Sequence, residues 1–197
     1  MNEFIKGEQI MENRCEWAQK NEIMEKYHDE EWGKPLHDDQ KLFEFLILEG
    51  MQAGLSWMTI LRKREAFRLA YEDFDVLKVA GFDQKKVEEL MSNAGIIRNR
   101  QKIEASINNA KHFLEVVEEF GSFNQYIWAF VNHRPIINRW DKISELPAKT
   151  ELSDIISADL KRRGFKFVGS TIVYAHMQAT GMVNDHLAYC LCHPEFR

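Results

Sequence analysis

A single carboxylate, Glu49, occupies a position where the sequence pattern predicts an apolar side chain. It continues the i, i+3, i+4, i+7 repeat of Leu42, Phe45 and Leu46, and so lies on the same predicted helix face. Burying an unpaired carboxylate is costly, so Glu49 would have to be hydrogen-bonded, protonated, or facing a cavity or a cationic ligand. Spacing alone favours a simpler interpretation, a partly exposed glutamate at the helix end beside Gly50.

Aromatic side chains are concentrated in the sequence around this carboxylate. Three of the five tryptophans, Trp17, Trp32 and Trp57, precede residue 58, together with Tyr27. Aromatic stripes are more often core than ligand site. A carboxylate surrounded by several aromatic rings is nevertheless the composition of a pocket for a flat, electron-poor or cationic ring.

Two Cys/His pairs near the chain ends have the chemistry of a metal site. Cys15 and His28 are thirteen positions apart, and His186 and Cys190 form an i, i+4 pair that a helix would place on one face. Together they supply the four ligands of a closed tetrahedral Zn²⁺ site joining the chain ends. Spacing alone favours buried cysteines and surface histidines instead, since neither pair is a CxxC. Two rival ligands follow: Cys192 and His193.

Basic side chains form three clusters in this acidic chain, at 62–64, 98–102 and 161–166. Such clusters usually mark solvated helix faces. The middle one follows a break at 93–95 between two predicted helices. A glycine turn that opens a helix presents free N–H groups and a positive dipole end, which suit a phosphate. The pattern resembles a helix-hairpin-helix clamp on a DNA backbone, although many helical hairpins turn on glycine.

The elements that would position these residues are helical almost throughout. Capping residues and apolar periodicity predict helices that begin after Asp38 or Asp39, Ser56, Asp83, Asn99, Ser122, Ser153 and Ser170, with a short capped turn at Asp75. A last short helix is expected near Asn184, a brief strand at 165–168, and an irregular connection at 135–147. We therefore predict a compact all-α fold.

The composition limits the possible classes of protein. The chain has 197 residues, 45% hydrophobic and 12% aromatic, which suits one well-buried core. A net charge of −5 excludes a globally basic nucleic-acid-coating protein but allows a local basic face. Three cysteines do not suit a disulfide-stapled secreted domain. No stretch reads as a signal peptide or a good membrane span, so we expect a soluble, cytoplasmic protein with no membrane partner.

Several segments, in one order and without large gaps over residues 13–194, resemble the 3-methyladenine DNA glycosylase I family. They are Arg14–Trp17, Tyr27–Gly33, Leu48–Trp57, Asn93–Arg98, Phe130–His133, Lys161–Gly169 and Gly181–His186. So many motifs in sequence are far more specific than any one, and they outweigh the simpler interpretations above.

The resemblance implies a helix-hairpin-helix enzyme that flips out and hydrolytically excises 3-methyladenine from alkylated double-stranded DNA. It implies one structural zinc ion per chain, held by Cys15, His28, His186 and Cys190, which reverses the conclusion from spacing. It assigns Glu49 as the catalytic residue. The base-binding residues would be Trp17, Tyr27, Trp32 and Trp57. The DNA-binding residues would be Leu55 as a wedge in the vacated stack, Gly95, Arg98 and Lys166.

The implied chemistry fits these residue types. Methylation makes adenine a cationic leaving group, so the enzyme must mainly select and bind an activated ring. No aspartate follows the hairpin shortly after Gly95, and no lysine is positioned as a Schiff-base former. We therefore expect a monofunctional glycosylase without strand cleavage. Met24 and Met51 depart from the family pattern, and their effect on the shape of the pocket stays open.

The predicted organisation is one helical domain at 13–197, built of two lobes with the base pocket between them. Residues 1–12 have no counterpart in the family and are predicted to form a flexible tail, and a monomer is expected. A second interpretation stays open, a zinc-stabilised DNA-binding or damage-sensing module without catalysis. Release of free base with time would separate the two.

Overall fold

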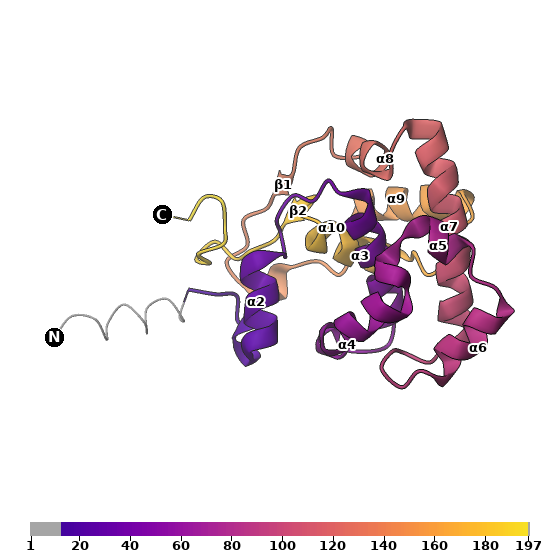
Figure 1. Cartoon of the computed structure of the whole chain (residues 1–197). Helices are drawn as coiled ribbons and strands as arrows, with labels where there is room; N and C mark the ends of the chain where they lie inside the picture. The colour runs from indigo at the N-terminus through magenta and orange to yellow at the C-terminus, as the bar shows by residue number, and fades with distance from the viewer. Residues whose placement is uncertain (1–12, 197) are drawn as a thin grey trace.

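The computed structural model describes residues 13–196, most of which are helical (Figure 1). The tail predicted at 1–12 lies outside the described residues. In chain order the elements are η1 (Ala18–Lys20), α2 (Glu22–Glu30), α3 (Asp39–Gln52), α4 (Trp57–Ala70), η2 (Glu72–Phe74), α5 (Val76–Ala80), α6 (Gln84–Ser92), α7 (Arg100–Phe120), α8 (Phe123–Ala129), β1 (Ile136–Ile137), η3 (Ile143–Glu145), α9 (Glu151–Arg162), α10 (Ser170–Ala179) and β2 (Val183–Asn184).

Polar side chains fix most helix starts, as the sequence predicts. Asp38, Ser56 and Asp83 each accept a hydrogen bond from the backbone N–H three residues later, at the starts of α3, α4 and α6. Two predicted starts were misplaced. Helix α9 begins after Thr150, whose hydroxyl and backbone form a reciprocal pair with Ser153, and α10 begins after Gly169.

Helix α3 is the central helix, with α4, α7, α8 and α10 packed around it (Figure 1). All ten residues from 42 to 51 are buried. A helix enclosed on every side loses the usual distinction between a core face and a solvent face. Any polar group on it must therefore be paired or face a cavity.

Helix α2 was missed by the sequence analysis. Its apolar residues do fall on one face, but the helix is only nine residues long and strongly charged, and its start at Asn21 was not recognised. The side chain of Asn21 caps its start by accepting from the backbone N–H of Met24. The helix buries Tyr27 and His28, so it supplies residues to both candidate sites.

The last predicted helix was wrong. Residues near Asn184 are extended because β2 pairs in parallel with β1, and an isolated bridge between Trp140 and Leu187 continues the ladder. The segment predicted as irregular at 135–147 therefore contains a strand and η3. The prediction of an entirely helical fold needs this small correction.

The strand predicted at 165–168 was also wrong. Side chains take the place of a partner strand, since Asn109 donates to the carbonyl of Lys166 and accepts from its N–H. Asn108 donates to the carbonyl of Gly164, and Ser157 donates to that of Val168. The turn is thereby fixed against α7 and α9. Within residues 13–196, no helix is both long and apolar enough to cross a lipid bilayer.

Candidate active site and metal centre

Glu49 is buried in the last turn of α3, with 3% of its surface exposed. Burial alone raises the pKa of its carboxyl group to about 8, because no hydrogen bond or cation of the described chain offsets the lost hydration. The interpretation as a partly exposed glutamate was therefore wrong. The carboxyl group has the environment expected of one that faces a cavity and waits for a partner.

A cavity of about 240 Å³ adjoins this carboxyl group. Helices α2, α3, α4 and α10 contribute to its wall, together with the segments before η1 and after η3. The lining residues are Trp17, Met24, Tyr27, Trp32, Glu49, Gln52, Trp57, Leu146, Ala175 and Gln178. The structure thus brings together Glu49 and all four aromatic residues predicted from the sequence.

The aromatic rings of the cavity are inclined to one another. Tyr27 and Trp57 have centroids 5.5 Å apart at 53°, and Trp17 meets Trp32 edge-on at 5.0 Å and 77°. The indole Nε1 of Trp57 is buried with no hydrogen-bond partner in residues 13–196. Leaving such a donor unpaired is costly, so it is suited to an acceptor on a bound molecule.

Tyr27 joins the carboxylate to the aromatic wall. Burial raises the pKa of its phenol, and the nearby Glu49 and Glu31 raise it further. The hydroxyl therefore keeps its proton at neutral pH and can donate a hydrogen bond into the site.

Four cavity residues were missed by the sequence analysis: Gln52, Leu146, Ala175 and Gln178. Gln52 lies one helical turn after Glu49 and could have been found from that spacing. The others come from distant parts of the chain and carry no local signal. Met24 does line the cavity. Met51 is packed in the main core and does not line the cavity.

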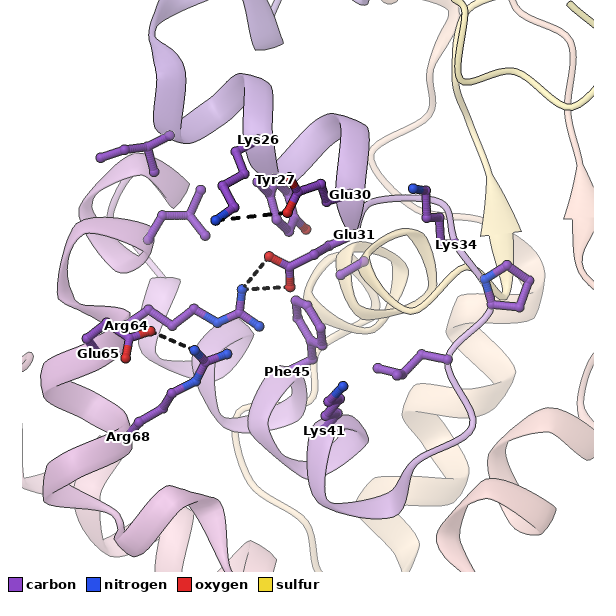
Figure 2. Close-up of a pocket in the computed structure, with 15 residues that line it drawn as sticks. Lys26, Tyr27, Glu30, Glu31, Lys34, Lys41, Phe45, Arg64, Glu65 and Arg68 are labelled. Carbon is purple, nitrogen blue, oxygen red and sulfur yellow. Dashed lines mark hydrogen bonds and ion pairs between the residues drawn. The ribbon is translucent and has the colours of Figure 1, made fainter.

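A second, larger hollow of about 560 Å³ shares Tyr27 with the cavity (Figure 2). Figure 2 shows charged side chains of this hollow facing one another in pairs, Lys26 with Glu30, Arg64 with Glu31 and Arg68 with Glu65. Arg64 lies 2.7 Å from Glu31, and Lys26 approaches Glu30 at 4.0 Å. Arg64 also contacts the buried Glu44 at 2.7 Å. Of the residues predicted to bind base, DNA or metal, Tyr27 alone lines this hollow.

The four predicted metal ligands form a buried cluster. Ligand atoms of Cys15, His28, His186 and Cys190 all lie within 4.8 Å of one another. His186 Nδ1 is 3.1 Å from His28 Nε2 and 3.5 Å from Cys190 Sγ. Tetrahedral zinc with sulfur and nitrogen ligands requires ligand separations of roughly 3.3–3.8 Å. The donor set and its spacing therefore fit a Zn²⁺ ion.

The prediction that a helix brings His186 and Cys190 together was wrong, although the two residues do meet. His186 and Cys190 lie in no helix. They approach through a turn in which the Cys190 N–H donates to the Leu187 carbonyl at 2.7 Å. Gly33 makes room for the cluster, because a Cβ at this position would lie 3.0 Å from the His186 ring, and its φ of +74° suits glycine.

Outer groups orient both histidines. The His28 Nδ1 is 2.8 Å from an Asp29 oxygen, and Arg14 holds that carboxylate with two nitrogens. The His186 Nε2 is 3.0 Å from the Trp32 carbonyl. Each contact leaves the opposite ring nitrogen facing the cluster, as metal sites require.

The two rival ligands lie outside the cluster of four. Cys192 groups with Asp29 around the other nitrogen of His28. His193 is turned to the carbonyl of Asn138, 3.0 Å away. Neither joins the four buried ligand atoms.

The turn between α6 and α7 forms the predicted helical hairpin. The N–H of Gly95 is not free, because the Asn93 side chain accepts from it at 2.8 Å. Lys63 donates from α4 to the carbonyls of Ala94 and Gly95. The turn is thereby fixed to α4. The Gly95 N–H is therefore not the free donor that the sequence predicted.

Arg98, Lys166 and Leu55 are exposed, and Leu55 leaves 42% of its surface accessible in the turn between α3 and α4. Many other basic side chains are paired within the described chain, such as Arg100 with Glu88 and Arg163 with Glu119. Exposed cations without such partners are the ones available to a polyanion.

Lys102 was missed by the sequence analysis as an individual residue. It is buried at the start of α7 and donates to the carbonyls of Met51 at 2.8 Å and Ala53 at 2.7 Å. Burial lowers the pKa of its ammonium group. It joins the hairpin to the end of α3 that carries Glu49.

Comparison with known proteins decides the family. The family model described as methyladenine glycosylase matches residues 17–193. The chain belongs to the methyladenine glycosylase family. Within that family it is 49% identical to DNA-3-methyladenine glycosylase 1 of Escherichia coli K12, over 92% of this chain and 97% of that protein. It is 48% identical to DNA-3-methyladenine glycosylase of Haemophilus influenzae, over 92% and 98%.

Solved structures of the family have the same fold. A crystal structure of 3-methyladenine DNA glycosylase I has a TM-score of 0.89 at 46% identity and covers 92% of this chain and 100% of that one. The Staphylococcus aureus 3-methyladenine DNA glycosylase I, solved to explain 3-methyladenine recognition, has a TM-score of 0.90 at 36% identity and covers 94% and 98%. The family resemblance found in the sequence is confirmed.

Proposed function

We propose that this methyladenine glycosylase hydrolyses the bond between 3-methyladenine and deoxyribose in alkylated double-stranded DNA. The observation that carries the proposal is the buried Glu49 carboxyl group, which has no partner among residues 13–196, in an aromatic-lined cavity. The cationic ring and the Glu49 carboxylate would each gain a counter-charge when the methylated base enters the cavity. A neutral, normally stacked base offers no such gain and costs more to extrude.

The reaction needs little from the protein beyond binding and orientation. Water adds to the sugar carbon and loses a proton to solvent, while the bond to the ring nitrogen breaks and its electrons neutralise the ring as it leaves. Glu49 stabilises positive charge in the cavity, and Trp57 and Tyr27 offer an aromatic surface and donors. The base would sit between two lobes of a single domain spanning 13–197.

DNA would be held along the exposed side chains near the cavity. Leu55 would fill the gap left by the extruded base, and Arg98 and Lys166 would contact phosphates with the Gly95 turn nearby. The amine of Lys102 already donates to two carbonyls, so it is not available to attack the sugar. This supports a monofunctional enzyme without strand cleavage.

Zinc would act as a structural staple. Cys15, His28, His186 and Cys190 would hold it, and four protein ligands would leave no open position for chemistry. We expect about one zinc per chain. A chelator or Cys15→Ser should lower the melting temperature strongly, and a stable, metal-free Cys15→Ser protein would contradict the assignment.

The deciding experiment measures free base with time from a methylated duplex. Wild type should release 3-methyladenine in many turnovers, and Glu49→Ala and Trp57→Ala should each collapse the rate. Full activity in both variants would overturn the pocket assignment. Bound DNA without any free base would favour the second candidate, a damage-sensing module, which the same hairpin and metal cluster would serve.

A further inference from the structure

Asp185 is a fully buried carboxylate that belongs to neither the metal cluster nor the cavity wall. None of its surface is exposed. One oxygen accepts from Asn138 Nδ2 and Trp140 Nε1, each at 2.8 Å. The other accepts from the Tyr174 hydroxyl at 2.6 Å and from Gln178 Nε2 at 2.7 Å. Four short, charge-assisted bonds make this a rigid anchor.

The anchor decides which way the amide of Gln178 faces. An ionised carboxylate only accepts hydrogen bonds, so the group of Gln178 that meets Asp185 must be its NH₂. The amide oxygen, at the other end of the group, has no partner in residues 13–196.

Gln178 also lines the cavity that contains Glu49. Its place on α10 is fixed a second time by its own carbonyl, which accepts from the Gly33 N–H at 2.9 Å. With its NH₂ held by Asp185, Gln178 can offer the cavity a neutral acceptor from α10 in addition to the carboxylate from α3. Two acceptors in one small cavity suit a cationic ring whose edge carries N–H donors.

We propose that Gln178, oriented by Asp185, is a specificity-determining residue of the cavity that favours a 6-amino purine over a 6-oxo purine. The proposal rests on the proposed function and deepens it. The 6-amino group would donate a hydrogen bond to the Gln178 amide oxygen. A 6-oxo group would place a second acceptor oxygen against it, and the two oxygens would repel each other. Asp185 is the positioning residue, because it prevents the amide from turning.

The test compares two substrates on the same enzyme molecules. Duplex DNA treated with a methylating agent carries both 3-methyladenine and 3-methylguanine, and kcat/KM is measured for release of each. Gln178→Met keeps the side-chain length and removes the acceptor. We expect the ratio of 3-methyladenine to 3-methylguanine release to fall about 10-fold, the effect of losing one hydrogen bond to a charged group. The ratio does not depend on the folded fraction of the variant.

Asp185→Asn tests the positioning role. An amide at this position cannot accept all four donors, so Gln178 is free to turn, and we expect the ratio to fall at least about threefold. Zinc content is measured on the same preparation, because His186 is the next residue. Gln125→Met, at an exposed position on α8, is the matched control and should keep the wild-type ratio.

The outcomes separate the two proposals. If wild type releases neither base, the proposed function fails. If wild type releases both and Gln178→Met keeps the ratio within twofold, the function stands and the role of Gln178 is overturned. If only Asp185→Asn keeps the wild-type ratio, the positioning role of Asp185 is overturned.

Discussion

The two hollows that meet at Tyr27 differ in how their charges are satisfied. The larger one is lined by arginines, lysines and glutamates, and its most buried cation, Arg64, lies between Glu31 and Glu44 (Figure 2). Within the part of the chain that the structure describes, the smaller one contains a carboxyl group without a donor and an indole N–H without an acceptor. The unsatisfied groups therefore mark the candidate site better than volume does.

The difference also separates stability from function. Groups that are already paired gain little free energy from binding a ligand. Removing one partner of such a pair leaves the other charge buried and uncompensated, which destabilises the fold. Buried groups without partners lower the stability of the empty protein, and pairing them with a ligand raises the affinity of the complex. Substitutions in the two hollows should therefore have opposite consequences for stability and activity.

The largest expected effect is on activity in Glu49→Gln. Base release should fall by roughly 100-fold or more, since one preorganised charge is lost. In wild type, kcat/KM should rise with pH up to about 8, where the Glu49 carboxyl group ionises in the empty site. In Glu49→Gln this pH dependence should be absent. Rates of base release measured from pH 6 to 9 test this. Equal rates for wild type and Glu49→Gln at pH 8.5 would contradict it.

The same variant should change the pH dependence of stability. The folded pKa of Glu49 is raised above its unfolded value, so its contribution is complete below about pH 4.5 and is lost as the pH rises through about 8. Urea unfolding of wild type and Glu49→Gln across this window checks the sign. A steeper loss of stability in the variant would contradict it.

In the larger hollow the main effect should be on stability. Arg64→Met leaves Glu44 buried with less compensation and should lower the free energy of unfolding by about 3 kcal/mol. Base release per folded molecule should stay within about threefold. Lys26→Met is the matched control, because Lys26 and its partner Glu30 in the same hollow are both exposed and such a pair is worth about 1 kcal/mol or less. A 100-fold loss of activity in Arg64→Met would remove the distinction between the hollows.

A smaller effect is expected from Trp57→Phe. The substitution keeps an aromatic ring in the cavity and removes the Nε1–H that has no partner in the described chain. Base release should fall roughly 3- to 10-fold, while the melting temperature should not fall. If Trp57→Phe released the base at the wild-type rate, the Nε1–H would take no part in recognition.

The smallest effect should come from Lys41→Gln. Lys41 is exposed at the rim of the larger hollow, and we expect base release and DNA affinity within about twofold of wild type. A loss of more than tenfold would show that this hollow also takes part in binding DNA.

Local signals predicted the helices well where capping side chains and apolar repeats coincided, as at Ser56 and Asp83. They failed in α2, a short and strongly charged helix whose cap at Asn21 was not recognised. They also failed at 183–188, where pairing with a segment some fifty residues earlier overrides helix propensity. The grouping of the four Cys and His residues came from the resemblance, because spacing gave a helical reason that the structure does not support.

The amino-acid sequence alone determined the family, the capped helices and the placement of Glu49 on an apolar helix face. Whether that carboxyl group met water, a cation or an empty cavity depended on residues far along the chain. The tertiary structure enclosed α3, brought α10 opposite it and fixed the amide of Gln178 through Asp185. Hydration, pairing and cavity shape arise from contacts between distant segments, and no local pattern specifies them.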